Sequence, residues 1–186
     1  MTTKKTNGYN DMNSMTVDNN VNPEAFDIGA FTSAPLKFDM RIEFQGMSPD
    51  DVFEVMGDPE RVKDWYLLAR EVHLHEPDAD GQIDFDVEFI LFGMVKEEIL
   101  HWDLPTRYVY RAYGEDFPLK GYVALIEVRQ SGDGEGVMIW RQYFDEIEGD
   151  YNSRIVPVIL PPLNEASLER LAPMIGGTNV EVKSYL

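Results

Sequence analysis

The histidines are the first candidates for proton transfer, and the sequence has three of them and no cysteine. His73 and His75 lie two positions apart, so on an extended strand they would share one face and could begin a metal site. Val72 and Leu74 look like the inward residues of that strand, so we expect both histidines in solvent and predict no metal and no cofactor. His101 is the better general acid or base, since imidazole titrates near neutral pH.

The orientation of His101 depends on its strand. Successive side chains of a strand point to opposite faces, so only one of His101 and Trp102 can face inward, and the sequence leaves the choice open. Glu97 has the same parity as His101. A histidine–carboxylate pair and an ion pair between Glu97 and an arginine on a neighbouring strand are therefore both open.

Arg141 and Tyr143 are the other candidate catalytic residues. Arg141 shares a face with Ile139 and Tyr143, which predicts an inward orientation. An inward guanidinium can bind an enolate or carboxylate oxygen through two N–H groups, and the Tyr143 hydroxyl could carry a proton. The alternative for Arg141 is an ion pair with one of the 34 acidic residues.

A set of amphipathic aromatic residues favours a ligand pocket over a solid core. Pockets are mostly apolar, with a few converging polar groups, and a buried tyrosine hydroxyl needs a partner that a ligand can supply. Half-exposed tyrosines on the outer surface of a sheet are the alternative. The residues that we expect to bind ligand are Trp65, Tyr66, Phe85, Val87, Phe89, Tyr108, Tyr110 and Tyr122.

The elements that must position these residues begin with a strand. Apolar and polar residues alternate from Leu36 to Phe44, as in a strand with one buried face. Ser48-Pro49-Asp50-Asp51 then gives a helix start, with a serine cap, a proline in the first turn and two acids at the positive end. Asp58-Pro59-Glu60-Arg61 repeats that start, which predicts two short helices.

Most of the remaining sequence predicts antiparallel strands with short connections. Together with the first strand they make a sheet of about seven strands; the later ones are expected at 70–75, 83–91, 95–103, 107–113, 122–130 and 137–147.

The C-terminal segment has helical spacing but contains Pro157, Pro161 and Pro162. Each proline removes a backbone donor and collides with the preceding turn. The sequence therefore predicts a short helix or turn, a break, and a final helix from Asn164 to about Leu171.

The overall composition limits the class of protein. A formal net charge of −18 over 186 residues argues against nucleic-acid binding, which needs clustered Lys and Arg. No stretch has the length of apolar sequence that spans a membrane, and the N-terminus lacks a secretory signal, so we expect a cytoplasmic protein.

Residues 1–34 are polar and aperiodic, which predicts a flexible tail, although Phe26, Ile28 and Phe31 could dock on the domain. The domain is expected at 35–177, followed by a tail or short strand at 178–186.

Several stretches resemble the START-like (SRPBCC) superfamily, in particular its polyketide cyclase/dehydrase and lipid-transport group. Asp58-Pro59-Glu60 with Asp64-Trp65 resembles the second helix of that group. Residues 102–110 are similar to its strand-turn-strand, and Gly132-Asp133-Gly134 with Trp140 and Phe144 to its last hairpin. The resemblance covers roughly 36–171 and implies an α+β helix-grip fold, a curved antiparallel sheet around a C-terminal helix. The predicted helix break departs from the continuous helix of the group.

Three functions follow from this fold and these residues. The first is a polyketide cyclase/dehydratase-like enzyme that binds a hydrophobic small molecule in an internal cavity, with proton transfer by His101 or a tyrosine and enolate stabilisation by Arg141. The second is a non-catalytic protein that binds or transfers a lipid or apolar metabolite, with the proline-containing segment as a gate. The third is an interaction protein with a filled core. Trp102, Trp140 and Phe144 offer an outward apolar surface for a homodimer.

Overall fold

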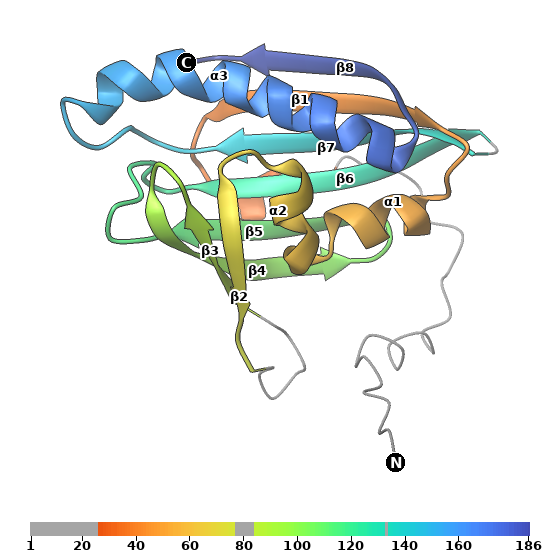
Figure 1. The fold of residues 1–186 in the computed structure, drawn as a ribbon, viewed down its shortest axis with the longest axis horizontal. Helices are drawn as coiled ribbons and strands as arrows, with labels where there is room; N and C mark the ends of the chain where they lie inside the picture. The colour runs from red at the N-terminus through yellow and green to blue at the C-terminus, as the bar shows by residue number, and fades with distance from the viewer. Residues whose placement is uncertain (1–25, 77–83, 133) are drawn as a thin grey trace.

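The chain folds around one antiparallel sheet of eight strands, in a computed structural model that describes residues 26–76, 84–132 and 134–186 (Figure 1). The strands lie in the order β2-β3-β4-β5-β6-β7-β1-β8, so the first strand of the chain pairs with its last two. The strands are β1 (Leu36–Gln45), β2 (Ala69–Leu74), β3 (Phe85–Phe89), β4 (Gly93–Asp103), β5 (Arg107–Tyr113), β6 (Val123–Gly132), β7 (Glu135–Tyr143) and β8 (Gly177–Ser184).

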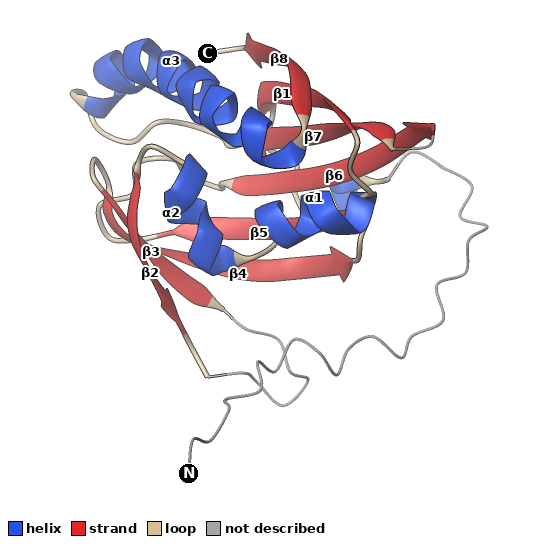
Figure 2. Cartoon of the chain, turned by 45° about the vertical axis from the view of Figure 1, so that its right-hand side comes forward, coloured by secondary structure: helices blue, strands red, loops and turns tan. Residues whose placement is uncertain are grey.

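The sheet is strongly curved, and three helices lie on its concave face. β2 and β3 run steeply across the direction of β6, β7 and β1 (Figures 1 and 2). The helices are α1 (Pro49–Met56), α2 (Val62–Trp65) and α3 (Asn152–Leu171). This is the helix-grip arrangement that the sequence predicted, with two short helices after the first strand and a helix near the C-terminus that is longer than predicted.

Capping groups at Ser48 begin α1. The Ser48 hydroxyl accepts from the Asp51 backbone N–H at 3.2 Å, and the Asp51 carboxylate accepts from the Ser48 backbone N–H at 3.1 Å. The two bonds satisfy donors that a helix start leaves free. The chain then turns through a single 3-10 turn (Pro59–Arg61) into α2, which places Trp65 and Tyr66 over the sheet.

The predicted break in the C-terminal helix is wrong, because α3 runs without interruption through Pro157, Pro161 and Pro162. Its buried residues recur at helical spacing, and this stripe packs toward the sheet. The apolar contacts of one continuous stripe outweigh the backbone bonds that the prolines remove. The buried residues of α3 are Val156, Leu160, Asn164, Ser167, Leu168 and Leu171.

The two chain segments outside the predicted domain are ordered where the structure describes them. Residues 178–186, expected as a tail or short strand, contain most of β8, which pairs with β1. Of residues 1–34, only 26–34 are described, and Phe26, Ile28 and Phe31 pack against the convex face of the sheet. Among the described residues, no helix is both long enough and apolar enough to cross a membrane.

Candidate functional site

The orientation of His101 is decided by a bulge in β4. Ile99 pairs with Tyr110, but the next paired residue, His101, lies opposite Val109, so Leu100 is an extra residue on its strand. A bulge of one residue reverses the facing of everything beyond it. Glu97 and Ile99 therefore face the concave side, whereas His101 faces the convex side, so the His101–Glu97 pair, one of the two alternatives that the sequence left open, does not form.

His101 lies in an aromatic contact on the convex face. Its ring stacks on Phe26, with 5.4 Å between ring centroids, and lies 5.7 Å from Phe31. The guanidinium of Arg107 lies 4.7 Å above the Phe26 ring, in a cation–π contact. The imidazole thus holds the N-terminal segment against the sheet and does not reach the concave face.

Arg141 and Tyr143 also lie on the convex face, so the inward orientation expected for Arg141 is wrong. Arg141 pairs with Asp39 at 3.5 Å and with Glu127 at 3.7 Å, which is the ion-pair alternative. Burial opposes ionisation of Asp39, but the hydrogen bond from Arg41 and the charge of Arg141 outweigh it and lower the pKa of Asp39. Tyr143 packs with Leu125 under the N-terminal segment, and burial raises the pKa of its hydroxyl.

We expect Phe26→Ala to lower the free energy of unfolding by about 1–2 kcal/mol, because it removes a ring that packs on His101 and Arg107. Urea denaturation measures this change. The matched control is Tyr151→Ala, which truncates an aromatic ring that is 73% exposed and should cost less than about 0.5 kcal/mol. Equal effects of the two substitutions would show that residues 26–34 contribute no docking energy.

All eight residues expected to bind ligand are buried in the cluster on the concave face. Trp140 and Phe144 belong to the same cluster. They cannot form the outward surface that was expected for a homodimer, so that prediction is wrong for both residues. Trp102 is 36% exposed and packs on Tyr108, with 5.2 Å between ring centroids.

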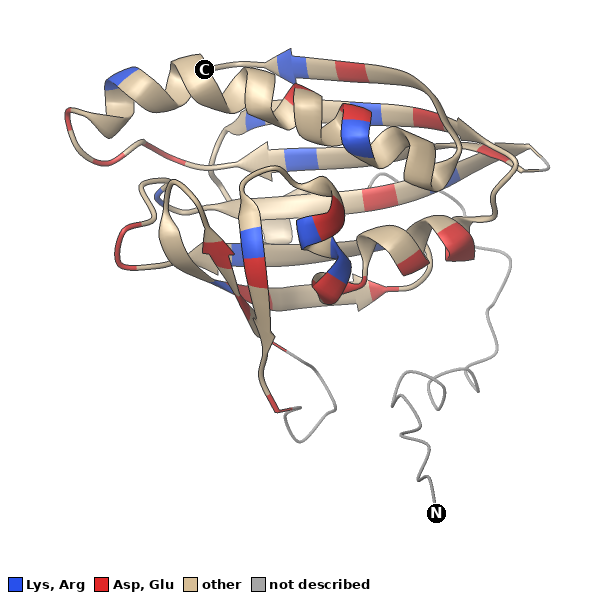
Figure 3. Ribbon diagram, viewed as in Figure 1, with Lys and Arg blue, Asp and Glu red and all other residues tan. Residues whose placement is uncertain are grey.

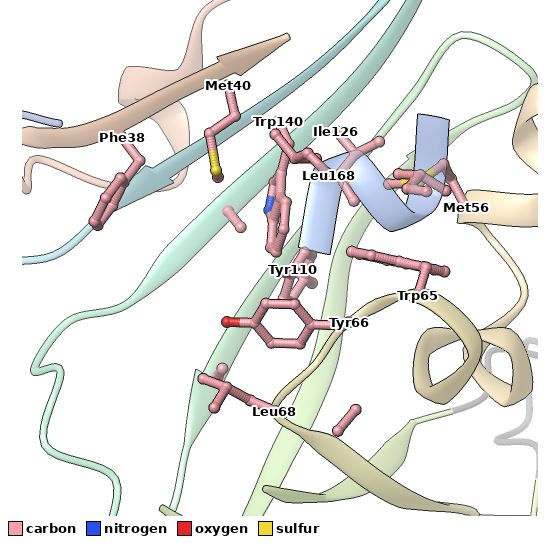
Figure 4. Packing of buried hydrophobic residues seen from close by; sticks show 14 of the residues in the cluster. Phe38, Met40, Met56, Trp65, Tyr66, Leu68, Tyr110, Ile126, Trp140 and Leu168 are labelled. Atoms are coloured by element: carbon pink, nitrogen blue, oxygen red, sulfur yellow. The ribbon is translucent and has the colours of Figure 1, made fainter. Parts of the chain in front are cut away.

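Aromatic rings occupy the space between the sheet and α3, where an open cavity was expected. Trp140 meets Trp65 at 5.6 Å and Tyr66 at 5.5 Å between ring centroids, both edge to face (Figure 4). A depression of about 260 Å³ lies instead between the start of α3 and the C-terminus, where Phe144, Pro157 and Leu186 contribute to its lining. In this conformation the aromatic side chains of the interior pack against one another.

Glu97 is a buried carboxyl on this apolar face. It is 8% exposed and lies in β4 between Phe85 of β3 and Ala112 of β5. Its charge acts on three surrounding hydroxyls, those of Tyr66, Tyr110 and Tyr122.

Two buried amides extend this group to α3 and β7. The Tyr66 hydroxyl donates to the Asn164 Oδ1 atom at 3.4 Å, and the Asn164 amide donates to the Gln142 Oε1 atom at 3.5 Å. Both contacts are long, and Asn164 and Gln142 are almost fully buried. The interior polar cluster, as we name it below, consists of Glu97, Tyr66, Tyr110, Tyr122, Asn164 and Gln142.

Burial raises the pKa of Glu97 to about 8. The carboxyl is therefore mostly neutral at pH 7 and can donate a hydrogen bond, while a minor fraction is ionised and can accept a proton. Burial also raises the pKa of Tyr66, Tyr110 and Tyr122, and the charge of Glu97 adds to each effect. The tyrosines remain neutral hydrogen-bond donors at any physiological pH.

Cations are absent from the buried polar residues of the described chain. These residues are Asp39, Glu97, Glu127, Gln142, Asn164 and Ser167. Asp39 and Glu127 pair with arginines on the convex face. Among the described residues, Glu97 is thus the buried acidic side chain of the concave face. Lys and Arg positions are scattered over the helices and strands (Figure 3), and none of these side chains is buried among the described residues.

The sequence pattern identified the aromatic residues of this site, but Glu97 was not among the site residues that it predicted. Glu97 has the same parity as Val95 and Ile99, and that apolar pair is the signal that could have marked it as inward-facing. The sequence analysis left the partner of Glu97 open between His101 and an arginine, since no sequence signal revealed the extra residue at Leu100.

The comparisons with known proteins agree with this architecture. A family model described as polyketide cyclase / dehydrase and lipid transport matches residues 35–175. No curated protein matches the chain significantly.

Three similar solved structures show the same fold at low sequence identity. A START superfamily protein from Mycobacterium smegmatis has a TM-score of 0.58 and 11% identity, over 76% of this chain and 95% of its own. The di-domain ARO/CYC protein StfQ of the steffimycin biosynthetic pathway has a TM-score of 0.54 and 11% identity, over 75% of this chain and 51% of its own. A norcoclaurine synthase point mutant from Thalictrum flavum has a TM-score of 0.53 and 19% identity, over 77% of this chain and 96% of its own.

Proposed function

Because the chain belongs to the polyketide cyclase/dehydrase and lipid transport family, we propose that it binds a hydrophobic small molecule between the concave face of the sheet and α3, with Glu97 as the proton-transfer group. The observation that carries the proposal is the buried Glu97 carboxyl, which faces aromatic rings and has a pKa of about 8. Such a group takes over the role first assigned to His101 and Arg141.

Glu97 has the chemistry for dehydration of a β-hydroxyketone. The ionised carboxylate removes a proton from the carbon beside the carbonyl, and the resulting enolate oxygen accepts hydrogen bonds from tyrosine hydroxyls. The neutral carboxyl then returns the proton to the departing hydroxyl, which leaves as water. The products are an unsaturated ketone and water, and Glu97 is again ionised.

A direct test uses the aldol of benzaldehyde and acetone, whose dehydration to benzalacetone is followed by ultraviolet absorbance. We expect Glu97→Gln to lower kcat/KM about 100-fold or more, the usual contribution of a general base. In the wild type, kcat/KM should rise about tenfold per pH unit up to pH 8, because the reactive form of Glu97 is the carboxylate.

The control variants are His101→Ala and Arg141→Gln, which alter side chains on the convex face. Both should keep kcat/KM within a few fold of the wild type. A Glu97→Gln variant that turns over normally would contradict the catalytic role, and a large loss in either control would return that role to the convex face.

The second candidate is a carrier that binds an apolar metabolite without chemistry. It is supported by the scarcity of ionisable groups, since Glu97 has no buried cation or histidine beside it among the described residues. The carrier predicts that benzalacetone binds, measured by displacement of Nile red, while the aldol is not dehydrated. A protein that binds neither Nile red nor benzalacetone would contradict both functions.

A further inference from the structure

Two buried indole N–H groups on the concave face lack an acceptor. The Nε1 atoms of Trp65 and Trp140 have no hydrogen-bond partner among the described residues, although the side chains are only 2% and 3% exposed. A buried donor without an acceptor loses its hydrogen bonds to water and gains none in the protein, which is unfavourable. Such a cost is recovered when a bound molecule supplies the acceptor.

The donor of Trp140 lies beside the interior polar cluster. Its ring contacts Tyr66 edge to face at 5.5 Å, and the Tyr66 hydroxyl donates to Asn164 and is acted on by the charge of Glu97. In Figure 4 the Trp140 nitrogen and the Tyr66 hydroxyl point to the same side of the packed rings. An oxygen on this side could accept from the Trp140 indole N–H.

The groups around Glu97 also limit the charge of a ligand. β3 and β5 present Phe85 and Ala112 beside it. The loop after α2 presents Tyr66, β5 presents Tyr110, the residue just before β6 is Tyr122, and α3 presents Asn164. All are uncharged at neutral pH, so a ligand carboxylate would find no cation, and burying an unpaired charge is costly.

From these observations we infer that the interior takes an uncharged ligand with a carbonyl oxygen, and that the Trp140 indole N–H donates a hydrogen bond to this oxygen. The inference rests on the proposed function, since it requires binding in the interior. It adds a binding residue and a ligand class, a neutral ketone or ester as opposed to a fatty-acid anion or an amine.

The indole signals of the intact protein give a direct test, because the chain has three tryptophans. In a ¹⁵N-labelled sample, saturation with benzylacetone should move the Trp140 indole proton downfield, while butylbenzene, which lacks the oxygen, should not. Trp102, partly exposed and outside this contact, is the internal reference. A Trp140 signal that responds equally to both compounds would overturn the inference.

The binding affinities of the same ligands give a second test of the inference. Trp140→Phe should weaken benzylacetone about tenfold and leave butylbenzene within about threefold, a comparison that cancels any general loss of packing. At pH 7, hydrocinnamate and phenethylamine should bind at least tenfold more weakly than benzylacetone.

The outcomes separate this inference from the proposed function. If hydrocinnamate binds most tightly, the neutral ligand class is wrong but the interior site stands. The same holds if phenethylamine binds most tightly and its affinity rises from pH 6 to pH 8 as Glu97 ionises. Absence of binding by all four compounds would instead count against the proposed function itself.

Discussion

Glu97→Gln is expected to stabilise the protein, and the gain should grow by about 3 kcal/mol between pH 5 and pH 8. The pKa of Glu97 is about 8 in the folded protein against a reference value of 4.5. Between these values the unfolded chain loses the proton while the folded one keeps it, so wild-type stability falls as pH rises. Glutamine cannot ionise, and the variant therefore lacks this loss.

Urea denaturation of both proteins at pH 5 and pH 8 measures the difference. The matched control is Glu98→Gln on the same strand, whose side chain faces the other way and pairs with Arg111 at 2.6 Å. This variant should lose stability slightly, since exposed ion pairs contribute little. A Glu97→Gln gain that is the same at both pH values would show that the carboxyl ionises as it does in water.

Pro162→Ala should raise the free energy of unfolding by about 1–2 kcal/mol. Pro162 lies on the exposed side of α3, where its ring removes the N–H that would bond to the Val158 carbonyl. Alanine restores that donor without loss of buried contacts, and the more flexible unfolded chain offsets only part of the gain. The measurements are urea denaturation and amide hydrogen exchange in α3, which should slow.

The reference for this prediction is Val158→Ala, one turn earlier and 69% exposed, which should change stability by less than about 0.5 kcal/mol. If Pro162→Ala lowers the free energy of unfolding, the proline stabilises α3, and the missing backbone hydrogen bond does not determine the stability of this helix.

The fold was largely predictable because local and long-range signals agree. The alternation from Leu36 to Phe44 and the Ser48–Asp51 cap describe elements whose residues also pack in the final structure. The signals disagree in α3, where local backbone chemistry favours a break and the buried stripe favours continuity. The buried stripe determines that the helix is continuous, because its residues pack against strands that are distant in the sequence.

The candidate site was predictable in its walls but not in its chemistry. Tyr66, Tyr110 and Tyr122 lie where the aromatic pattern placed them, on the inner cluster. The orientation of His101 depends on a single unpaired residue, and nothing in the composition of β4 marks Leu100 as that residue. The orientation of Arg141 depends on which face of β7 the helices cover, and strand parity alone cannot decide between the two faces.

The extra residue in β4 has a consequence for how this protein could change. Deletion of Leu100 would restore simple alternation along the strand, and His101 would then follow Ile99 directly and stay on the convex face opposite Val109. A one-codon loss would thus remove the bulge without bringing the imidazole to the buried acid. Related chains with or without this residue would then present the same inner carboxyl and the same outer histidine on the same scaffold.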